Sequence, residues 1–193
     1  MMKNRRFSIF IVIILCMVSF SDLKAQAPAN DKASVKTFVQ HFYDWYNVLQ
    51  ADDDFTRKHH LSPFAFAIKE RGNYFDKPLR QAISDYFHKP LKSGETGLDF
   101  DPIAAAQDTR SGFQTGNVKQ VGNTFRINLH DLPKGKSEKE ILAAETFLVV
   151  VAVKVGKDWK LANFIYPAKG NMSQTDLIKL LAHQKNSAIN GLE

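Results

Sequence analysis

The spacing of apolar residues changes character halfway along this chain, and this change constrains the fold more than any other feature of the sequence. Over residues 33–50, apolar side chains recur every three or four positions, which predicts an amphipathic helix. Further on, Phe125, Ile127 and Leu129 alternate with polar residues, as in a half-buried strand. Helices followed by consecutive antiparallel strands predict an α+β fold, with the helices packed on one face of a curved antiparallel sheet.

Turn and cap residues locate the remaining elements. Ser62 as N-cap and Pro63 at the first helical position predict a second helix. Ser173, with Asp176 three residues later, resembles a capping box and predicts a last helix. The other expected elements are a third helix over 78–88, a long connection over 90–112 with one helical turn near Ala104, and strands over 113–121, 124–130, 147–155 and 159–166.

The start of the chain has the pattern of a secretory signal peptide. Basic residues open it, and the apolar run that follows, about 14 residues long, is too short to span a bilayer. We expect cleavage after Ala25, with cleavage after Ala27 as the alternative. The sequence therefore predicts a signal peptide over 1–25, a short polar leader over 26–33, and a periplasmic or secreted location.

Composition argues against several classes of function. The chain of 193 residues has 26 basic and 20 acidic residues, a net charge of +6, and one cysteine. Loss of the signal peptide would remove four basic residues, one acidic residue and Cys16, which leaves a net charge of +3 and no thiol. We therefore expect one domain that has no disulfide framework, no thiolate metal site and no long basic run for nucleic-acid binding.

Two motifs of nucleotide and ester chemistry are incomplete. Gly135-Lys136-Ser137 ends like a phosphate-binding loop, but the position of the required upstream glycine holds His130. We interpret these residues as an ordinary loop. No G-x-S-x-G nucleophile elbow occurs in the chain, so serine hydrolase chemistry has no local support.

Metal-binding patterns are incomplete as well. Asp99, Asp101 and Asp108 have the composition of a calcium loop but lack its turn glycine. His59 and His60 are adjacent, so a helix would point them in different directions, and we interpret them as surface or cap residues. We expect neither a metal nor another cofactor.

His41 and Asp44 form a candidate catalytic pair on the first predicted helix. They are three residues apart, so the carboxylate could orient the imidazole as a general base if both faced a cavity. His41, however, lies at the edge of the apolar stripe and Asp44 on the far side of the helix. We favour a solvated helix face and keep the catalytic pair as the alternative.

An aromatic cluster on the same helix has two interpretations. We expect Phe42 and Trp45 to be largely buried against the sheet, because aromatic residues at helical spacing usually form a core. Tyr43 and Tyr46 bring hydroxyl groups that need partners when buried, and they could instead line an amphipathic cavity.

The second candidate site is the loop-like segment around Ala104. Asp101 and Asp108 are expected to serve the structure, by capping the turn near Ala104 or by accepting hydrogen bonds from backbone N–H groups. Ligand binding is the alternative. The candidate ligand-binding residues are Tyr43, Tyr46, Asp99, Asp101, Gln107 and Asp108.

Three stretches of the sequence resemble an exported bacterial family: Phe42-Tyr43-Asp44-Trp45-Tyr46, then Leu98-Asp99-Phe100-Asp101-Pro102 running into Ala106-Gln107-Asp108, and Trp159-Lys160-Leu161. The family is known as domain of unknown function 3828 and belongs to the nuclear-transport-factor-2-like superfamily. The resemblance covers residues 34–166 and implies a cone-like domain in which a bent sheet encloses a pocket. Residues 167–193 form a C-terminal helical extension that does not match the family pattern.

We therefore expect an exported envelope domain that is a non-catalytic binding module for a small molecule or a protein segment. One alternative is a cofactor-independent hydrolase or lyase that uses an acidic or histidine base in the cone pocket, as superfamily enzymes do. Another is an inhibitor or immunity partner of a secreted toxin. Enzymatic activity and oligomeric state stay open at this point. No membrane span is expected once the signal is removed.

Overall fold

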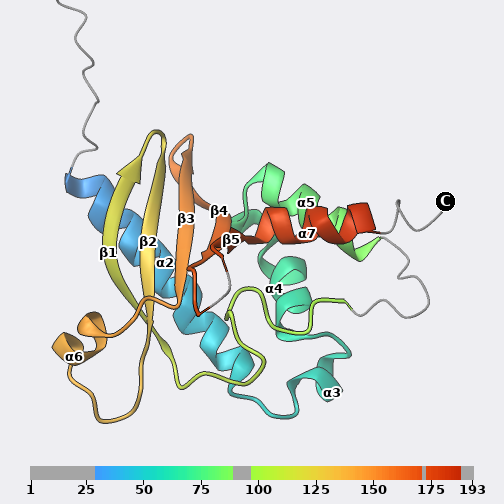
Figure 1. The fold of residues 1–193 in the computed structure, drawn as a ribbon, viewed down its shortest axis with the longest axis horizontal. Helices are drawn as coiled ribbons and strands as arrows, with labels where there is room; N and C mark the ends of the chain where they lie inside the picture. Colours follow the sequence, from blue (N-terminus) through green and yellow to red (C-terminus); the bar gives the residue numbers. More distant parts are fainter. Residues whose placement is uncertain (1–28, 89–96, 171–172, 188–193) are drawn as a thin grey trace, which may run out of the picture.

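The computed structural model describes residues 29–88, 97–170 and 173–187 (Figure 1). The expected signal peptide and both of its cleavage positions lie outside these residues. Within the described part of the chain, no helix is both long enough and apolar enough to cross a membrane.

The first helices precede all the strands along the chain, as the sequence predicts. The helices are α2 (Ala29–Gln50), α3 (Phe55–His59), α4 (Pro63–Arg71), the 3₁₀ turn η1 (Gly72–Tyr74), α5 (Lys77–Phe87), α6 (Glu138–Ala143) and α7 (Leu177–Ser187). The strands are β1 (Phe113–Val121), β2 (Thr124–Asp131), β3 (Leu148–Val155), β4 (Asp158–Tyr166) and β5 (Thr175–Asp176). Each strand pairs antiparallel with the next, in the order β1-β2-β3-β4-β5. The predicted α+β fold with a curved antiparallel sheet and a C-terminal helix is confirmed.

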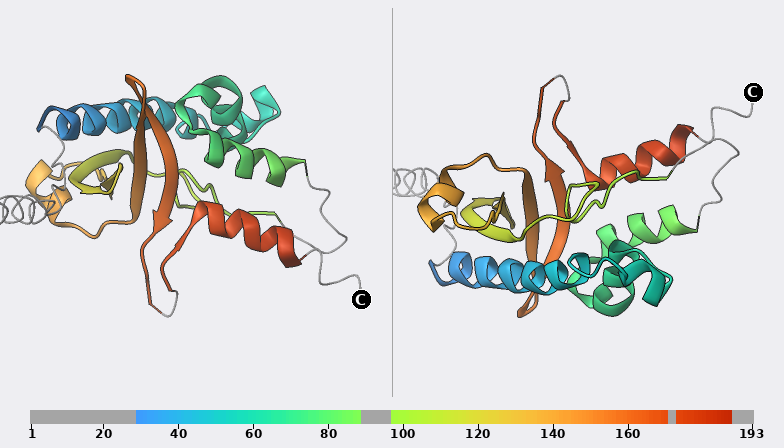
Figure 2. Two further views of the ribbon diagram at one scale, coloured as in Figure 1. Left: turned by 90° about the horizontal axis from the view of Figure 1, so that it is seen from above. Right: turned by 90° about the horizontal axis from the view of Figure 1, so that it is seen from below.

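The long helix α2 runs across one face of the sheet (Figure 2). Helix α6 lies beside the β1 end of the sheet, whereas α3, α4, α5 and α7 gather at the β4–β5 end (Figure 1). Helices α5 and α7 contact each other, and α7 also contacts β4. The sheet and α2 thus form one part of the molecule, and α3, α4, α5 and α7 extend it at the β4–β5 end.

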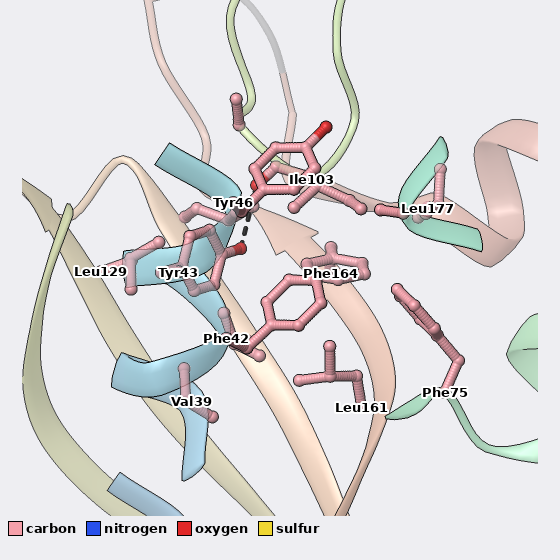
Figure 3. Close-up of a cluster of buried hydrophobic side chains, with 14 of the residues drawn as sticks. Val39, Phe42, Tyr43, Tyr46, Phe75, Ile103, Leu129, Leu161, Phe164 and Leu177 are labelled. Atoms are coloured by element: carbon pink, nitrogen blue, oxygen red, sulfur yellow. Dashed lines mark hydrogen bonds between the residues drawn. The ribbon is translucent and has the colours of Figure 1, made fainter. Parts of the chain in front are cut away.

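The hydrophobic core fills the space between α2 and the sheet. Phe42 and Tyr43 of α2 point toward Leu129 of β2 and toward Leu161 and Phe164 of β4 (Figure 3). All five side chains are fully buried. The expected burial of Phe42 is confirmed, because the apolar stripe of α2 faces the sheet.

Trp45 is buried less completely than expected. Its side chain is only half-buried, and the guanidinium group of Arg71 lies 4.0 Å from the centre of its ring. Arg71 also lies over Tyr74, at 5.1 Å. Trp45 therefore sits at the margin of the core, where a cation covers its outer face.

Helix α2 begins earlier than predicted. The leader was expected over 26–33, but the helix already starts at Ala29. Asp31 lies in the first turn, where a negative charge interacts favourably with the helix dipole, and it forms an ion pair with Lys154 of β3 at 2.7 Å. This long-range contact has no signature in the local sequence pattern.

The caps of α4 and α5 explain where these helices begin. The Ser62 side chain accepts a hydrogen bond from the backbone N–H of Ala65, which confirms Ser62 as the N-cap. Asp76 caps α5 in the same way through the N–H of Leu79. For α7, the cap is Asp176 rather than Ser173. Its carboxylate accepts from the N–H of Lys179.

Two short helices, α3 and α6, were not predicted. Helix α3 ends at His60, which adopts a left-handed backbone conformation with φ of 54°, so the interpretation of this histidine as a cap residue is confirmed. Helix α6 follows directly after the residues that we interpreted as an ordinary loop. Ser137 and Glu140 form a complete capping box at its start. This Ser-x-x-Glu pattern was visible in the sequence and marks the helix.

Candidate functional site

A groove with a volume of about 560 Å³ opens beside the C-terminal end of α2. Its walls come from the last turn of α2, the segment that leads into α4 through α3, the end of α5, and residues 98–109. These segments lie together at the lower right of Figure 1. We call this feature the α2–α5 groove. Its volume falls within the range of small-molecule sites in proteins.

One wall of the α2–α5 groove is apolar. It is formed by Leu49, Phe55, Phe64, Phe87 and Leu98. Phe87 is 48% exposed, although its ring centre lies only 5.5 Å from that of the buried Phe64. An exposed phenylalanine beside a concave apolar surface is a feature of binding sites.

Carboxylates also line the groove, and we call Asp52, Asp53, Asp99 and Asp108 its rim. Asp52 forms an ion pair with Lys58 at 2.8 Å. Asp53, Asp99 and Asp108 also line the groove, and none of them forms a hydrogen bond or ion pair with another described residue. The described residues that line it include no lysine, arginine or histidine. This described lining therefore combines apolar side chains with carboxylates.

Asp101 lies at the base of the groove with its side chain mostly buried. Its Oδ1 accepts hydrogen bonds from the backbone N–H groups of Ile103, at 2.9 Å, and Ala104, at 3.0 Å. Its Oδ2 accepts from the hydroxyl of Tyr46 and from Nε2 of Gln50, the latter at 3.2 Å. The expected role of Asp101 in capping the turn near Ala104 is thus confirmed.

Burial raises the pKa of Asp101 above its ordinary value of 3.8, and the hydrogen bonds from Tyr46, the backbone and Gln50 oppose this shift. A carboxylate has about four lone-pair sites, and the four donors around Asp101 fill them. A general base needs a free lone pair within reach of the proton that it removes. Asp101 therefore has a raised pKa but is not placed to act as a base.

Tyrosines fix the segment that carries Asp101. The Tyr43 hydroxyl donates to the carbonyl oxygen of Ile103 at 2.9 Å (Figure 3), and the Tyr166 hydroxyl donates to that of Pro102 at 2.9 Å. Burial raises the pKa of Tyr43, Tyr46 and Tyr166, so their hydroxyls stay protonated and remain donors. These contacts connect α2 and β4 to the base of the groove.

The six candidate ligand-binding residues divide into two groups. Asp99, Asp101, Gln107 and Asp108 line the α2–α5 groove together, although only Asp101 is tied into the fold by hydrogen bonds of its side chain. A structural role for Asp108 stays a prediction. Tyr43 and Tyr46 are fully buried and do not line the groove, because their rings are part of the core and their hydroxyls bond to the loop beneath it.

His41 and Asp44 lie away from the groove. Both side chains are exposed on α2, and the carboxylate of Asp44 accepts a hydrogen bond from Nε2 of Gln40 at 2.8 Å rather than from His41. Neither residue lines the groove. This placement agrees with the favoured interpretation of a solvated helix face.

Gln50 is a groove residue that the sequence did not indicate. Its side chain is 8% exposed, and its Nε2 donates to Asp101. Its Oε1 is buried and has no hydrogen-bond donor among the described residues. Asp52 and Asp53 form an acidic run directly after an apolar helix, and this pattern is the sequence signal that could have indicated a charged rim.

Arg110 holds the same segment from the other side. Its Nε donates to the carbonyl oxygen of Ala104 at 2.8 Å and its Nη2 to that of Ala105 at 2.9 Å. Its Nη1 forms an ion pair with both carboxylate oxygens of Asp131, and its guanidinium group lies 3.9 Å from the centre of the Phe147 ring. Ala105 has a positive φ of 50°, so these contacts hold a turn that alanine does not favour.

Arg110→Lys is expected to lower the free energy of unfolding by about 1–3 kcal/mol. A lysine keeps the charge but cannot reach the two carbonyl oxygens and Asp131 at once, because its ammonium group is a single point donor. Urea denaturation of both proteins measures the change. Arg126→Lys, at an exposed position of β2, is the matched control and is expected to change stability by less than about 0.5 kcal/mol. Equal losses in the two variants would contradict the anchoring role of Arg110.

Among the described residues, no group of three or more His, Cys, Asp or Glu side chains is arranged to hold a metal ion. In comparisons with known proteins, no protein-family model, curated protein or solved structure matches this chain.

Proposed function

We propose that this protein is an exported, non-catalytic binding module whose α2–α5 groove holds a small molecule or a segment of a partner protein. The observation that carries the proposal is the groove itself, which combines an apolar wall with carboxylates that have no partner among the described residues. Such a surface can bury the apolar part of a ligand and orient its polar part.

A catalytic role as a hydrolase or lyase is the second candidate. It is favoured by the raised pKa of Asp101, a carboxyl group that lines the groove. The filled lone pairs of Asp101 count against it. We therefore place binding before catalysis. An inhibitor or immunity role is a special case of partner binding.

The proposed relationship to the nuclear-transport-factor-2-like superfamily agrees with the architecture. A long first helix, shorter helices after it and a curved antiparallel sheet are part of the arrangement that the resemblance implies. The pocket enclosed by the sheet is not part of this agreement, because the described lining of the α2–α5 groove comes from helices and loops. Because that superfamily contains both enzymes and binding modules, the fold does not select between the two. The choice depends on the groove.

Export is part of the same proposal and can be tested separately. We expect the protein isolated from the envelope or medium of a bacterial host to begin at Gln26, or at Pro28 if cleavage follows Ala27. Intact-mass spectrometry distinguishes these two ends. A mass that still includes residues 1–20 would refute export with cleavage.

The binding function is tested with a chemically mixed fragment library, followed by ligand-observed NMR. We expect a set of fragments to bind the parent protein and to lose binding in Thr56→Trp, because Thr56 is an exposed lining residue and an indole there would fill the groove. Thr37→Trp places the same indole at an exposed position of α2 outside the groove and should keep binding. Fragments that bind all three proteins equally, or no binding at all, would refute the groove as the site.

A further inference from the structure

We propose that the α2–α5 groove selects ligands that carry an ammonium or guanidinium group on an apolar body. This inference rests on the proposed binding function and adds the chemical class of the ligand. It draws on three features of the groove: the charge of its rim, a buried acceptor without a donor in the side chain of Gln50, and its apolar lining residues.

The rim has an excess of negative charge. Asp53, Asp99 and Asp108 have no partner among the described residues, and only Asp52 is neutralised by a nearby cation, Lys58. Carboxylates of like charge around one concave surface produce a negative potential, which attracts a cation and repels an anion. A cationic ligand would supply a counterpart for carboxylates that have none among the described residues.

Gln50 gives an independent reason to expect a ligand that donates hydrogen bonds. Its Oε1 is a buried acceptor without a donor among the described residues, in a side chain that is more than nine-tenths buried and lines the groove. The orientation of the amide is fixed, because turning it would place Oε1 against Asp101. A buried acceptor without a donor destabilises a protein, so an N–H or O–H group that reached this oxygen from the groove would stabilise it. Ammonium and guanidinium groups provide only donors.

The apolar wall determines the rest of the ligand. Phe87 is 48% exposed at the groove and lies 5.5 Å from Phe64, ring centre to ring centre. An aromatic or aliphatic body can pack against these rings, and a cation held near their faces gains a further attraction. A hydrated inorganic cation would use the rim but leave this wall exposed. The combination favours an organic cation.

The ammonium or guanidinium group could come from two sources. One is a free organic amine, and the other is a lysine or arginine side chain on a segment of a partner protein. Three small probes of matched shape separate charge from shape: 2-phenylethylamine, neutral 2-phenylethanol and anionic 3-phenylpropionate. An acetylated, amidated Phe-Lys-Phe peptide represents the partner segment. Titrations followed by ¹H–¹⁵N NMR report affinity, and the side-chain amide of Gln50 and the backbone amides of Asp99 and Asp108 report the location.

We expect 2-phenylethylamine to bind more tightly than 2-phenylethanol, to shift the Gln50 side-chain amide, and to weaken as salt is added. The double variant Asp99→Asn with Asp108→Asn should bind the amine about fivefold more weakly. The control double variant Asp44→Asn with Asp85→Asn removes the same charge from exposed positions of α2 and α5 outside the groove and should bind like the parent. Tighter binding of the peptide than of the amine would support a partner segment as the source, and the reverse would support a small molecule.

The outcomes that overturn this inference differ from those that overturn the binding function. Equal or better binding of the alcohol or the carboxylate at the groove refutes selection for cations but leaves the groove as a binding site. Equal weakening in both double variants also refutes it, because the effect would then come from net charge alone. If no probe shifts groove resonances, the cation inference fails, and the fragment library decides whether the groove binds anything.

Discussion

Replacing Phe42 with alanine is expected to lower the free energy of unfolding by about 3–5 kcal/mol. The Phe42 side chain is fully buried between α2 and the sheet. Its ring centre lies 5.7 Å from that of Phe75, 5.5 Å from that of Tyr43 and 5.9 Å from that of Tyr46. These neighbours are themselves buried and held by other contacts, so the structure can collapse only partly into the cavity that the substitution leaves.

Urea denaturation followed by circular dichroism measures this loss. Val48→Ala is the matched control, because Val48 lies on the same helix but is 67% exposed, and it is expected to change stability by less than about 0.5 kcal/mol. Natural domains are only marginally stable, so a loss of the predicted size would leave a large fraction of the molecules unfolded. An unchanged denaturation midpoint for Phe42→Ala would mean that α2 does not pack on the sheet as described.

Long elements could be predicted because they contain enough residues for their period to show. Helix α2 has 22 residues and strand β2 has 8, and both carry their apolar residues at the expected spacing. Helices α3 and α6 have 5 and 6 residues, fewer than two turns, so no period is visible in them. For α6 the capping box was the only available signal.

The candidate site was predicted in part, and the missing part has a physical reason. Asp99, Asp101, Gln107 and Asp108 are close in the sequence, so their shared place in the groove could be anticipated. Gln50 joins them from 51 residues away, and its hydrogen bond to Asp101 leaves no trace in either local sequence. Tyr43 was misplaced because helical spacing shows which face of a helix is apolar but not whether that face meets a packed core or a cavity.

The groove and the core are connected through the segment that contains Asp101. Tyr43, Tyr46 and Tyr166 reach this segment from the core, and Arg110 reaches it from the other side. The base of the groove is therefore held by hydrogen bonds from several elements, whereas the rim residues Asp99 and Asp108 form no side-chain hydrogen bond or ion pair with other described residues. A groove held in this way, with uncommitted polar groups at its rim, suits binding better than a reaction that must move a proton at Asp101.

The second large effect is expected for Asp101→Ala, which should lower the free energy of unfolding by about 2–4 kcal/mol at neutral pH. The variant leaves four donors without their acceptor: two backbone N–H groups, the Tyr46 hydroxyl and the Gln50 amide. The loss falls short of the sum of four hydrogen bonds for two reasons. Water can enter from the groove, and the buried carboxylate itself carries a desolvation cost.

Asp101→Asn removes the charge but keeps the shape of the side chain. It should lower the free energy of unfolding by only about 1 kcal/mol. The amide keeps an oxygen for the N–H groups of Ile103 and Ala104. Its NH₂ group would face Nε2 of Gln50, but a turn of the Gln50 amide would bring the unpaired Oε1 into its place. Chemical denaturation of the parent and both variants measures the two losses. A loss for Asp101→Ala no larger than that for Asp101→Asn would contradict the structural role of this carboxylate.

The pH dependence of stability provides a further test of Asp101 with a definite sign. Because burial raises its folded-state pKa above the ordinary 3.8, the folded state holds the proton more tightly than the unfolded chain does. Its contribution to stability is therefore greatest below pH 3.8, falls as the pH rises toward the raised folded-state pKa, and stays constant above that value. The Asp101→Asn variant has no titrating group at this position. The free energy of unfolding of the parent minus that of the variant should therefore decrease between pH 3.8 and the raised folded-state pKa. The contributions of the other carboxylates cancel in this difference. A difference that instead increases with pH would mean that the hydrogen bonds to Asp101 outweigh its burial and that its pKa is lowered in the folded protein.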